Sequence, residues 1–330
     1  MKTLYGIGNP LMDSIHHVPV GAIEDIGFVP GSMNLIDPEQ HELIVQAGSA
    51  VRQTAGGSCA NTLRGVAFLS RLSGSVLNTR FAGAVSHDTH GQQFESILQD
   101  SGIHSDMVKK GGATGTSTIL VTPDGERTMF TCLGACRDFA VNDLQIEAIS
   151  SSDILYVTGY MWDTSNQQVA VEKAMTAAKN AASTVMIDIA DSFVVDRYRS
   201  ELMTAVTEFA DFVFCNIDEL MSLFEVDERS QALVLAAALP SVVWLVKTGS
   251  EGCFVVADTG IQKIETQAEQ ALDTTGAGDA FAAGFVFSYS NGGSIEHSAA
   301  AANRLAGAIV AVEGCSYDDI PGGIISYLLG

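Results

Sequence analysis

Short, uninterrupted apolar runs alternate with segments of helical spacing along most of the chain. An unbroken apolar run suits a strand covered on both faces, and strand–helix alternation favours a parallel sheet with helices on both sides. The sequence therefore predicts an α/β fold, a Rossmann-like three-layer αβα domain with a mainly parallel sheet. The expected strands are Leu4–Gly8, Arg80–Val85, Ile154–Thr158, Val185–Ile189, Phe212–Cys215 and Val242–Lys247, and the expected helices are Cys59–Leu72, His90–Gln99, Gln167–Ala182, Ile217–Phe224, Ala277–Tyr289 and Ile295–Val312.

Two segments, 15–35 and 117–133, break this alternation because they are rich in β-branched and turn residues. The second contains Pro123–Glu126 between two apolar runs, a pattern typical of a hairpin. We expect the two segments to form a small β-sheet that acts as a lid over the C-terminal ends of the main strands. The main domain would then comprise 1–14, 36–116 and 134–330.

A formal net charge of −22 over 330 residues argues against nucleic acid and anionic membrane surfaces as partners, because like charges repel. A small anionic ligand remains compatible, since backbone amides and bound cations can outweigh the overall field locally. No run approaches the roughly 18 apolar residues of a membrane span, and the first residues lack the layout of a signal peptide. We therefore expect a cytoplasmic protein with free cysteines and small-molecule partners.

Residues 273–285 place three small residues directly before an apolar segment of helical spacing. Gly276, Ala277 and Gly278 allow a tight turn and the close approach of a ligand, and a helix start favours an anion there. A carboxylate at this place, Asp279, would repel that anion, so its presence requires a reason. One such reason is that it takes a proton from a hydroxyl group that attacks a phosphate. The structural alternative is an ordinary acidic residue in the first turn of a helix.

The whole 273–285 segment resembles the C-terminal signature of the ribokinase/PfkB family of carbohydrate and nucleoside kinases. The resemblance implies a ribokinase-like fold and transfer of the γ-phosphoryl group of ATP to a primary hydroxyl. Asp279 would be the base, and the amides of Gly276, Ala277 and Gly278 would hold the developing charge. The run Gly8–Asp13 is closer to the adenosine kinase branch, which implies an adenosine-like nucleoside as acceptor.

Two alternatives remain open from the sequence. One is a sugar kinase of the ribokinase or fructokinase kind, and the other is a non-catalytic relative that binds a nucleoside or sugar. A dinucleotide-dependent oxidoreductase is disfavoured, since Gly6 and Gly8 are not followed by a third glycine that opens a helix.

Polar residues follow the first predicted strand and precede the first predicted helix. Taken alone, Asn9 and Asp13 fit a local turn, and a Gly-Ser pair fits a helix start. The resemblance implies that Asp13, Gly57 and Asn61 hold the hydroxyl groups of the substrate. Gly56 would accompany Gly57, and Asn9 would help to shape the pocket.

Later segments resemble the family's nucleotide and metal motifs. Asn216 and Glu219 also read as a helix cap, and the resemblance implies that they organise Mg²⁺ through water, in keeping with the oxygen ligands and retained waters that Mg²⁺ prefers. The residues that the resemblance places at ATP are Thr248, Gly249, Gly252 and Asn303.

The predicted lid carries Arg127, which resembles a lid arginine placed over the transferring phosphate; Arg137 is a second candidate. A cation that arrives on closure would stabilise transition-state charge. The resemblance also implies a K⁺ site at Asp273 and Thr275, with carbonyls near Gly314. Because lid sheets sometimes pair between subunits in such kinases, we expect a monomer or a homodimer.

Overall fold

The computed structural model describes residues 2–46, 48, 50–75, 77–123, 126–266 and 271–320. Its main sheet has the strand order β16-β15-β14-β13-β12-β11-β1-β5-β7. All neighbouring strands from β7 to β14 pair in parallel, whereas β15 and β16 run antiparallel at one edge. The strands are β1 (Thr3–Ile7), β5 (Asn78–Ala82), β7 (His104–Ser105), β11 (Ile154–Thr158), β12 (Thr184–Asp188), β13 (Phe212–Asn216), β14 (Val243–Lys247), β15 (Cys253–Ala257) and β16 (Gly260–Ile264). The predicted α/β class and mainly parallel sheet are confirmed.

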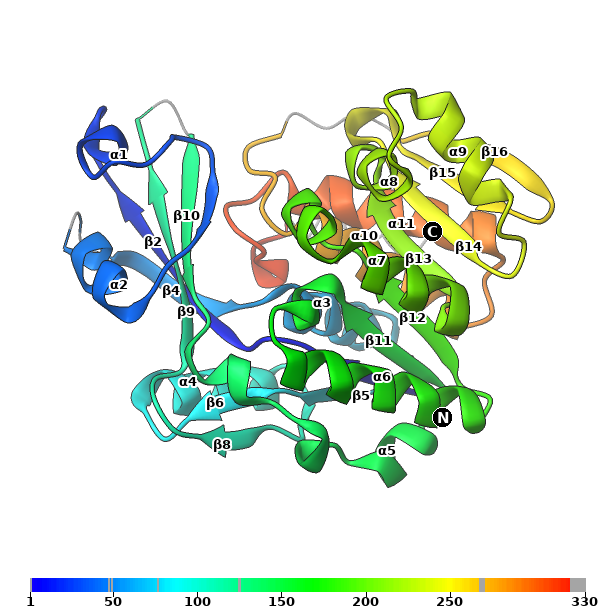
Figure 1. Ribbon diagram of the computed structural model, residues 1–330, viewed down its shortest axis with the longest axis horizontal. Coiled ribbons are helices and arrows are strands. Elements are labelled where there is room, and N and C mark those ends of the chain that lie inside the picture. Colours follow the sequence, from blue (N-terminus) through cyan, green and yellow to red (C-terminus); the bar gives the residue numbers. More distant parts are fainter. Residues whose placement is uncertain are drawn as a thin grey trace.

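Helices cover both faces of this sheet (Figure 1). Successive side chains of a strand point to opposite faces, so Leu4 lies in one core and Tyr5 in the other. The first face carries α3 (Ser58–Ser73), α4 (Thr89–Asp100), α10 (Ala277–Ser290) and α11 (Ile295–Ile309). The second carries α5 (Ile146–Ser150), α6 (Ser165–Asn180), α7 (Ser192–Phe209), α8 (Ile217–Phe224) and α9 (Arg229–Ala237).

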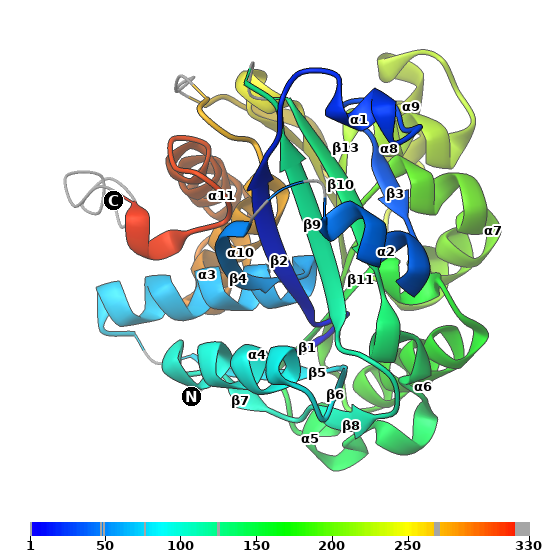
Figure 2. The same cartoon turned by 90° about the vertical axis from the view of Figure 1, so that its left-hand side faces the viewer.

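A separate sheet with the strand order β3-β10-β9-β2-β4 stands beside the main domain (Figure 2). Its strands are β2 (Leu11–His17), β3 (Met33–Leu35), β4 (Ala50–Gly56), β9 (Gly115–Val121) and β10 (Arg127–Cys132). Helices α1 (Ala22–Asp25) and α2 (Pro38–Val45) cover the face that points away from the main domain (Figure 1). The turn expected at Pro123–Glu126 includes residues 124 and 125, which lie outside the described residues.

The small sheet is larger than the predicted lid segments. Strand β4 and helix α2 belong to it, although the sequence-based boundaries assigned 36–116 to the main domain. Strand β4 escaped prediction because it is an edge strand with polar, largely exposed residues and no continuous apolar run. Strands β2 and β9 also begin earlier than expected, at Leu11 and Gly115.

Shorter elements complete the fold. They are the parallel pair β6 (Ala84–Ser86) and β8 (Val108–Lys110), and the 3₁₀ turns η1 (Gly134–Asp138), η2 (Val141–Asp143), η3 (Gly159–Trp162), η4 (Gly249–Glu251) and η5 (Tyr317–Asp319). Among the described helices, none has the length and apolar character needed to cross a membrane.

Candidate active site

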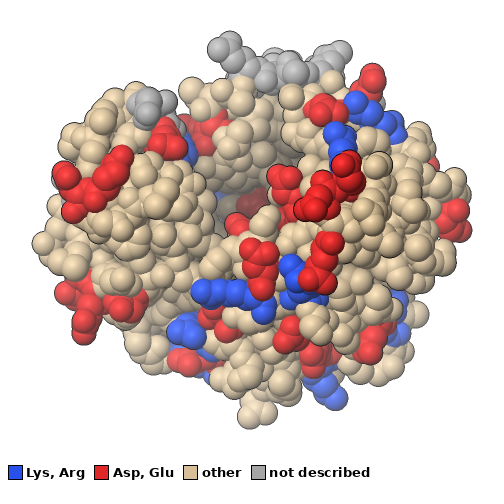
Figure 3. Space-filling view, turned by 45° about the horizontal axis from the view of Figure 1, so that its top comes forward, with Lys and Arg blue, Asp and Glu red and all other residues tan. Residues whose placement is uncertain are grey.

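A cavity of about 480 Å³ lies between the small sheet and the C-terminal ends of the main strands. The small sheet contributes β2, β9 and β10, and the main domain contributes the starts of α3 and α10 and the loops after β1, β11 and β12. Figure 3 shows the hollow, with acidic side chains at its rim. Ligands of open α/β sheets bind at this edge of the strands, so the cavity is the candidate active site.

Asp279 lies in the first turn of α10 and faces this cavity. Its carboxylate accepts hydrogen bonds from Ser58 Oγ at 2.7 Å and Asn61 Nδ2 at 2.9 Å, both in the first turn of α3. Burial raises the pKa of Asp279 to about 6, while these two hydrogen bonds pull it down. Ser58 was not predicted as a site residue, although it follows the Gly-Gly pair directly.

The turn before Asp279 supplies backbone amides. Gly276 caps α10 with φ 76°, a left-handed conformation that glycine adopts without strain. Gly276 and Gly278 line the cavity, whereas the Ala277 amide donates to the Thr274 carbonyl at 3.1 Å. Of the three predicted anion donors, Gly276 and Gly278 thus lie at the cavity, whereas the Ala277 amide is engaged within the turn.

Asp13, on β2 of the small sheet, lines the same cavity as Asp279. A Cβ at Gly56 would collide with its carboxylate, which explains glycine at that position. Burial and the charge of Asp279 together raise the pKa of Asp13 to about 7, against the lowering effect of Arg64. Gly57 caps α3 and lines the same cavity. The structure thus brings the predicted hydroxyl-binding residues to the predicted base.

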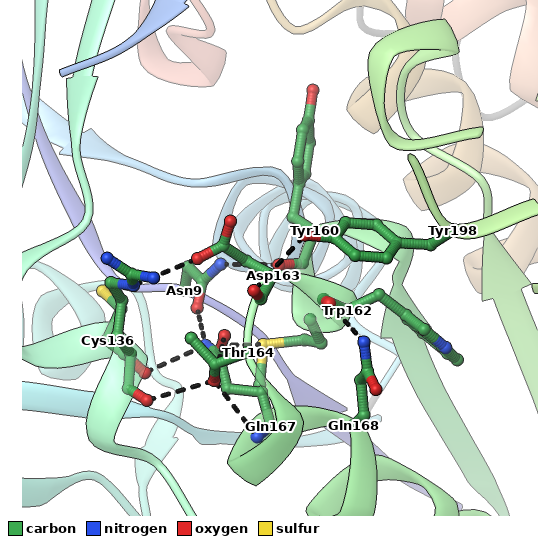
Figure 4. A network of polar contacts seen from close by, with 11 residues as sticks. Asn9, Cys136, Tyr160, Trp162, Asp163, Thr164, Gln167, Gln168 and Tyr198 are labelled. Carbon is green, nitrogen blue, oxygen red and sulfur yellow. Dashed lines mark hydrogen bonds and ion pairs between the residues drawn. The ribbon is translucent and has the colours of Figure 1, made fainter. Parts of the chain in front are cut away.

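Asn9 lines the cavity, but both ends of its amide are engaged by the protein (Figure 4). Its Nδ2 donates to the Tyr160 carbonyl at 3.1 Å, and its Oδ1 accepts from Gln167 Nε2 at 2.7 Å. The buried Gln167 also donates to the Cys136 carbonyl at 2.9 Å. Asn9 therefore joins the end of β1 to η1 and η3, which fits the expected shaping role.

Charged side chains from three neighbouring strand ends gather beneath the start of α10. Asn216 and Glu219 form a reciprocal cap of α8, and burial raises the pKa of Glu219 to about 7 while Lys247 lowers it. Lys247 Nζ lies 3.6 Å from Asp188 Oδ1 and would lie 3.3 Å from a Cβ at Gly278. Asp188 was not predicted as a site residue, because only the tertiary structure brings its strand end near Lys247, which precedes the predicted nucleotide residues Thr248 and Gly249.

Arg127 connects the small sheet to the loop before α10. Its guanidinium lies 2.8 Å from Asp273 Oδ2 and donates to Thr275 Oγ1 at 3.2 Å. The Asp273 carboxylate also accepts from the amides of Thr275 at 2.9 Å and Gly314 at 2.5 Å. In this conformation Asp273, which was predicted to bind K⁺, thus faces three hydrogen-bond donors: the Arg127 guanidinium and the amides of Thr275 and Gly314.

The second candidate arginine lies elsewhere, on η1. Arg137 Nε pairs with Asp163 Oδ2 at 3.1 Å, and its side chain is largely exposed. Of the two arginines, Arg127 is the one that lines the cavity.

The residues predicted at ATP cluster around the β14–β15 turn, away from the wall of the 480 Å³ cavity. Thr248 Oγ1 donates to the Gly252 carbonyl at 2.9 Å, and Gly249 opens η4 between them. Asn303, on α11, donates through Nδ2 to the Ile264 carbonyl at 3.0 Å. The structure brings these four residues into one region, and their role with ATP stays a prediction.

Comparisons with known proteins agree with this architecture. The model of the pfkB family carbohydrate kinases matches residues 28–321. An adenosine kinase of Schizosaccharomyces pombe is 24% identical over 94% of this chain and 95% of its own. The solved adenosine kinase of Sinorhizobium meliloti is 31% identical with a TM-score of 0.88, covering 99% of this chain and 98% of its own. A probable sugar kinase of Rhizobium etli CFN 42 is 30% identical with a TM-score of 0.89, covering 99% and 97%. The family match spans most of the chain and the fold match nearly all of it, so this protein belongs to the pfkB family of carbohydrate kinases.

Proposed function

We propose that this protein transfers the γ-phosphoryl group of ATP to the primary hydroxyl of an adenosine-like nucleoside. The observation that carries the proposal is that the cavity lining combines two kinds of side chain. Asp13, Asn61 and Asp279 suit the hydroxyl groups of a ribose. Phe193 and Tyr198 add an apolar and aromatic wall that a free sugar would leave unfilled. The adenosine kinases among the similar proteins support the same choice.

Asp279 is the proposed general base. It is held by Ser58 and Asn61, so its carboxylate is positioned to take the proton of the attacking hydroxyl. The amides of Gly276 and Gly278 would stabilise charge on the transferring phosphoryl group, joined by that of Ala277 if the turn opens. Arg127 reaches the same loop from the small sheet and would add a positive charge there. Closing the small sheet over the cavity would exclude water as a competing acceptor.

The donor set fits ATP with Mg²⁺. Mg²⁺, when bound, would neutralise negative charge on the phosphates. Because both oxygens of the buried Glu219 accept from Asn216, contact through water suits these two residues better than direct ligation. Thr248, Gly249, Gly252 and Asn303 would hold the nucleotide around the β14–β15 turn. K⁺ at Asp273 and Thr275 stays a prediction that requires Arg127 to move.

All six cysteines are free, which suits the cytoplasm that the sequence predicts. That location, and a monomeric or homodimeric state, stay predictions.

A substrate panel tests the proposed function. We expect ATP consumption with adenosine to exceed that with ribose or fructose by at least about tenfold in kcat/KM, because the sugars leave the apolar wall unfilled. Turnover with the sugars and none with nucleosides would support the sugar kinase instead. Binding of a nucleoside without any ATP consumption would indicate a non-catalytic relative.

The pH dependence of the rate follows from the two buried carboxyl groups. Asp279 accepts a proton only when ionised, and burial raises its pKa to about 6. The pKa of Asp13 is raised to about 7, in part by the charge of Asp279, so the two carboxyl groups titrate as a coupled pair. We expect kcat/KM for the nucleoside to fall as pH drops through the range from about 7 to 6. A flat profile down to pH 5 would contradict the assignment of Asp279 as base.

A further inference from the structure

Asp163 is a carboxylate in the lining of the cavity, and the mechanism above gives it no task. It follows η3, at the C-terminal end of β11, and lines the cavity with a side chain that is 14% exposed. A carboxylate in such a place requires partners, because burying an unpaired charge is costly. Its surroundings therefore indicate what it is placed to bind.

The protein itself holds Asp163 from two sides. Arg137 Nε lies 3.1 Å from Oδ2, and the Tyr198 hydroxyl donates to the Asp163 backbone carbonyl at 3.3 Å. Tyr198 interrupts α7 with φ −130° and ψ 27°, and it lines the cavity beside Asp163 (Figure 4). The backbone and one carboxylate oxygen are thus fixed in position.

The second carboxylate oxygen of Asp163, Oδ1, takes no part in the ion pair with Arg137 Nε. Oδ1 has no hydrogen bond to any of the described residues, and Figure 4 shows it pointing away from the ion pair. An ionised carboxylate only accepts hydrogen bonds, so a ligand partner must present an N–H or O–H group. The proposed function assigns the ribose hydroxyls to Asp13 and Asn61, which leaves the base to meet Asp163.

We propose that Asp163 selects nucleosides whose base carries an exocyclic amino group, by accepting a hydrogen bond from that group through Oδ1. The proposal rests on the proposed nucleoside kinase function and names its substrate class. Adenosine satisfies the requirement. Purine riboside lacks the amino group and would leave the carboxylate unpaired, and inosine would place a carbonyl oxygen against it. A site built around a hydrogen bond rejects analogues that cannot form it.

The test compares adenosine with purine riboside, which differ only by the amino group. For the wild type we expect kcat/KM and the affinity measured by calorimetry without ATP to favour adenosine by about 10- to 100-fold, the usual effect of a hydrogen bond to a charged group. In Asp163→Ala we expect both preferences to shrink to about threefold or less. In Asp163→Asn the new amide donor should improve inosine relative to adenosine.

Two controls separate recognition from a structural role. Asp138→Ala, an exposed aspartate on η1, should leave the preference unchanged. Arg137→Ala removes the group that positions Oδ2 but keeps the Asp163 carboxylate, so it should reduce the preference less than Asp163→Ala does. Equal losses for both nucleosides in Asp163→Ala, or a larger loss of the preference in Arg137→Ala than in Asp163→Ala, would overturn the proposal. Equal wild-type affinity for the two nucleosides would refute it as well, whereas a wild type that phosphorylates no nucleoside would refute the kinase assignment.

Discussion

Asp279→Asn is expected to lower kcat by about 10²–10⁴-fold while the fold and ATP binding are retained. Asparagine has nearly the shape of aspartate but cannot take a proton from the attacking hydroxyl. Its amide can still satisfy both neighbours, since Oδ1 can accept from Asn61 and Nδ2 can donate to Ser58, whose hydroxyl also accepts. The measurement is single-turnover phosphorylation of adenosine, together with ATP affinity by calorimetry.

A matched control is Asp100→Asn, which makes the same change at an exposed position at the end of α4 and should leave both quantities unchanged. Near-normal turnover by Asp279→Asn would reject the base assignment. Equal loss of turnover and of ATP affinity would point instead to a disturbed site, which circular dichroism of the variant would reveal.

The central sheet was predictable because its strands are covered on both faces. Ile154–Thr158 was predicted with the bounds that β11 has, since an unbroken apolar run leaves little choice of boundary. Helix α7 was not predicted, and its interruption at Tyr198 arises from tertiary packing that periodicity does not report. Strand β4 was missed for the opposite reason, because its exposed edge position leaves no apolar pattern.

The site residues also fall into two groups, those that a local sequence motif indicates and those that only the tertiary structure brings together. Asp279, Asn61 and Gly57 lie in short contiguous motifs, so the sequence could indicate them. The contact between Arg127 and Asp273 joins the small sheet to a loop far along the chain, and no local pattern reports it. The same holds for Lys247, Asp188 and Asp163, whose significance depends on which strand ends are neighbours.

Lys247 provides the largest expected effect on stability. Its ammonium group faces the buried carboxylates Asp188 and Glu219, and it also lowers the pKa of Asp279. Lys247→Met removes the positive charge but keeps much of the side-chain volume, leaving these carboxylates without their counter-charge. Removing one partner of a buried ion pair costs about 3–5 kcal/mol. We expect a loss of this size in the free energy of unfolding at pH 8, measured by urea denaturation without ligands.

The pH dependence and a second substitution test the electrostatic cause of that loss. A carboxyl group whose pKa is raised in the folded protein stabilises the folded state at pH values below its unfolded-state pKa. This contribution is lost as the pH rises through the folded-state pKa, which is about 7 for Glu219 and about 6 for Asp279. The loss in Lys247→Met should therefore be smaller at pH 5 than at pH 8.

Adding Asp188→Asn to Lys247→Met should restore much of the stability, because asparagine can still accept from the Ala190 amide and donate to the Tyr156 hydroxyl. Lys263→Met, at a surface lysine paired with the exposed Glu251, should change the free energy of unfolding far less than Lys247→Met does. A loss that is independent of pH and unrelieved in the double variant would show that Lys247 acts through packing rather than charge.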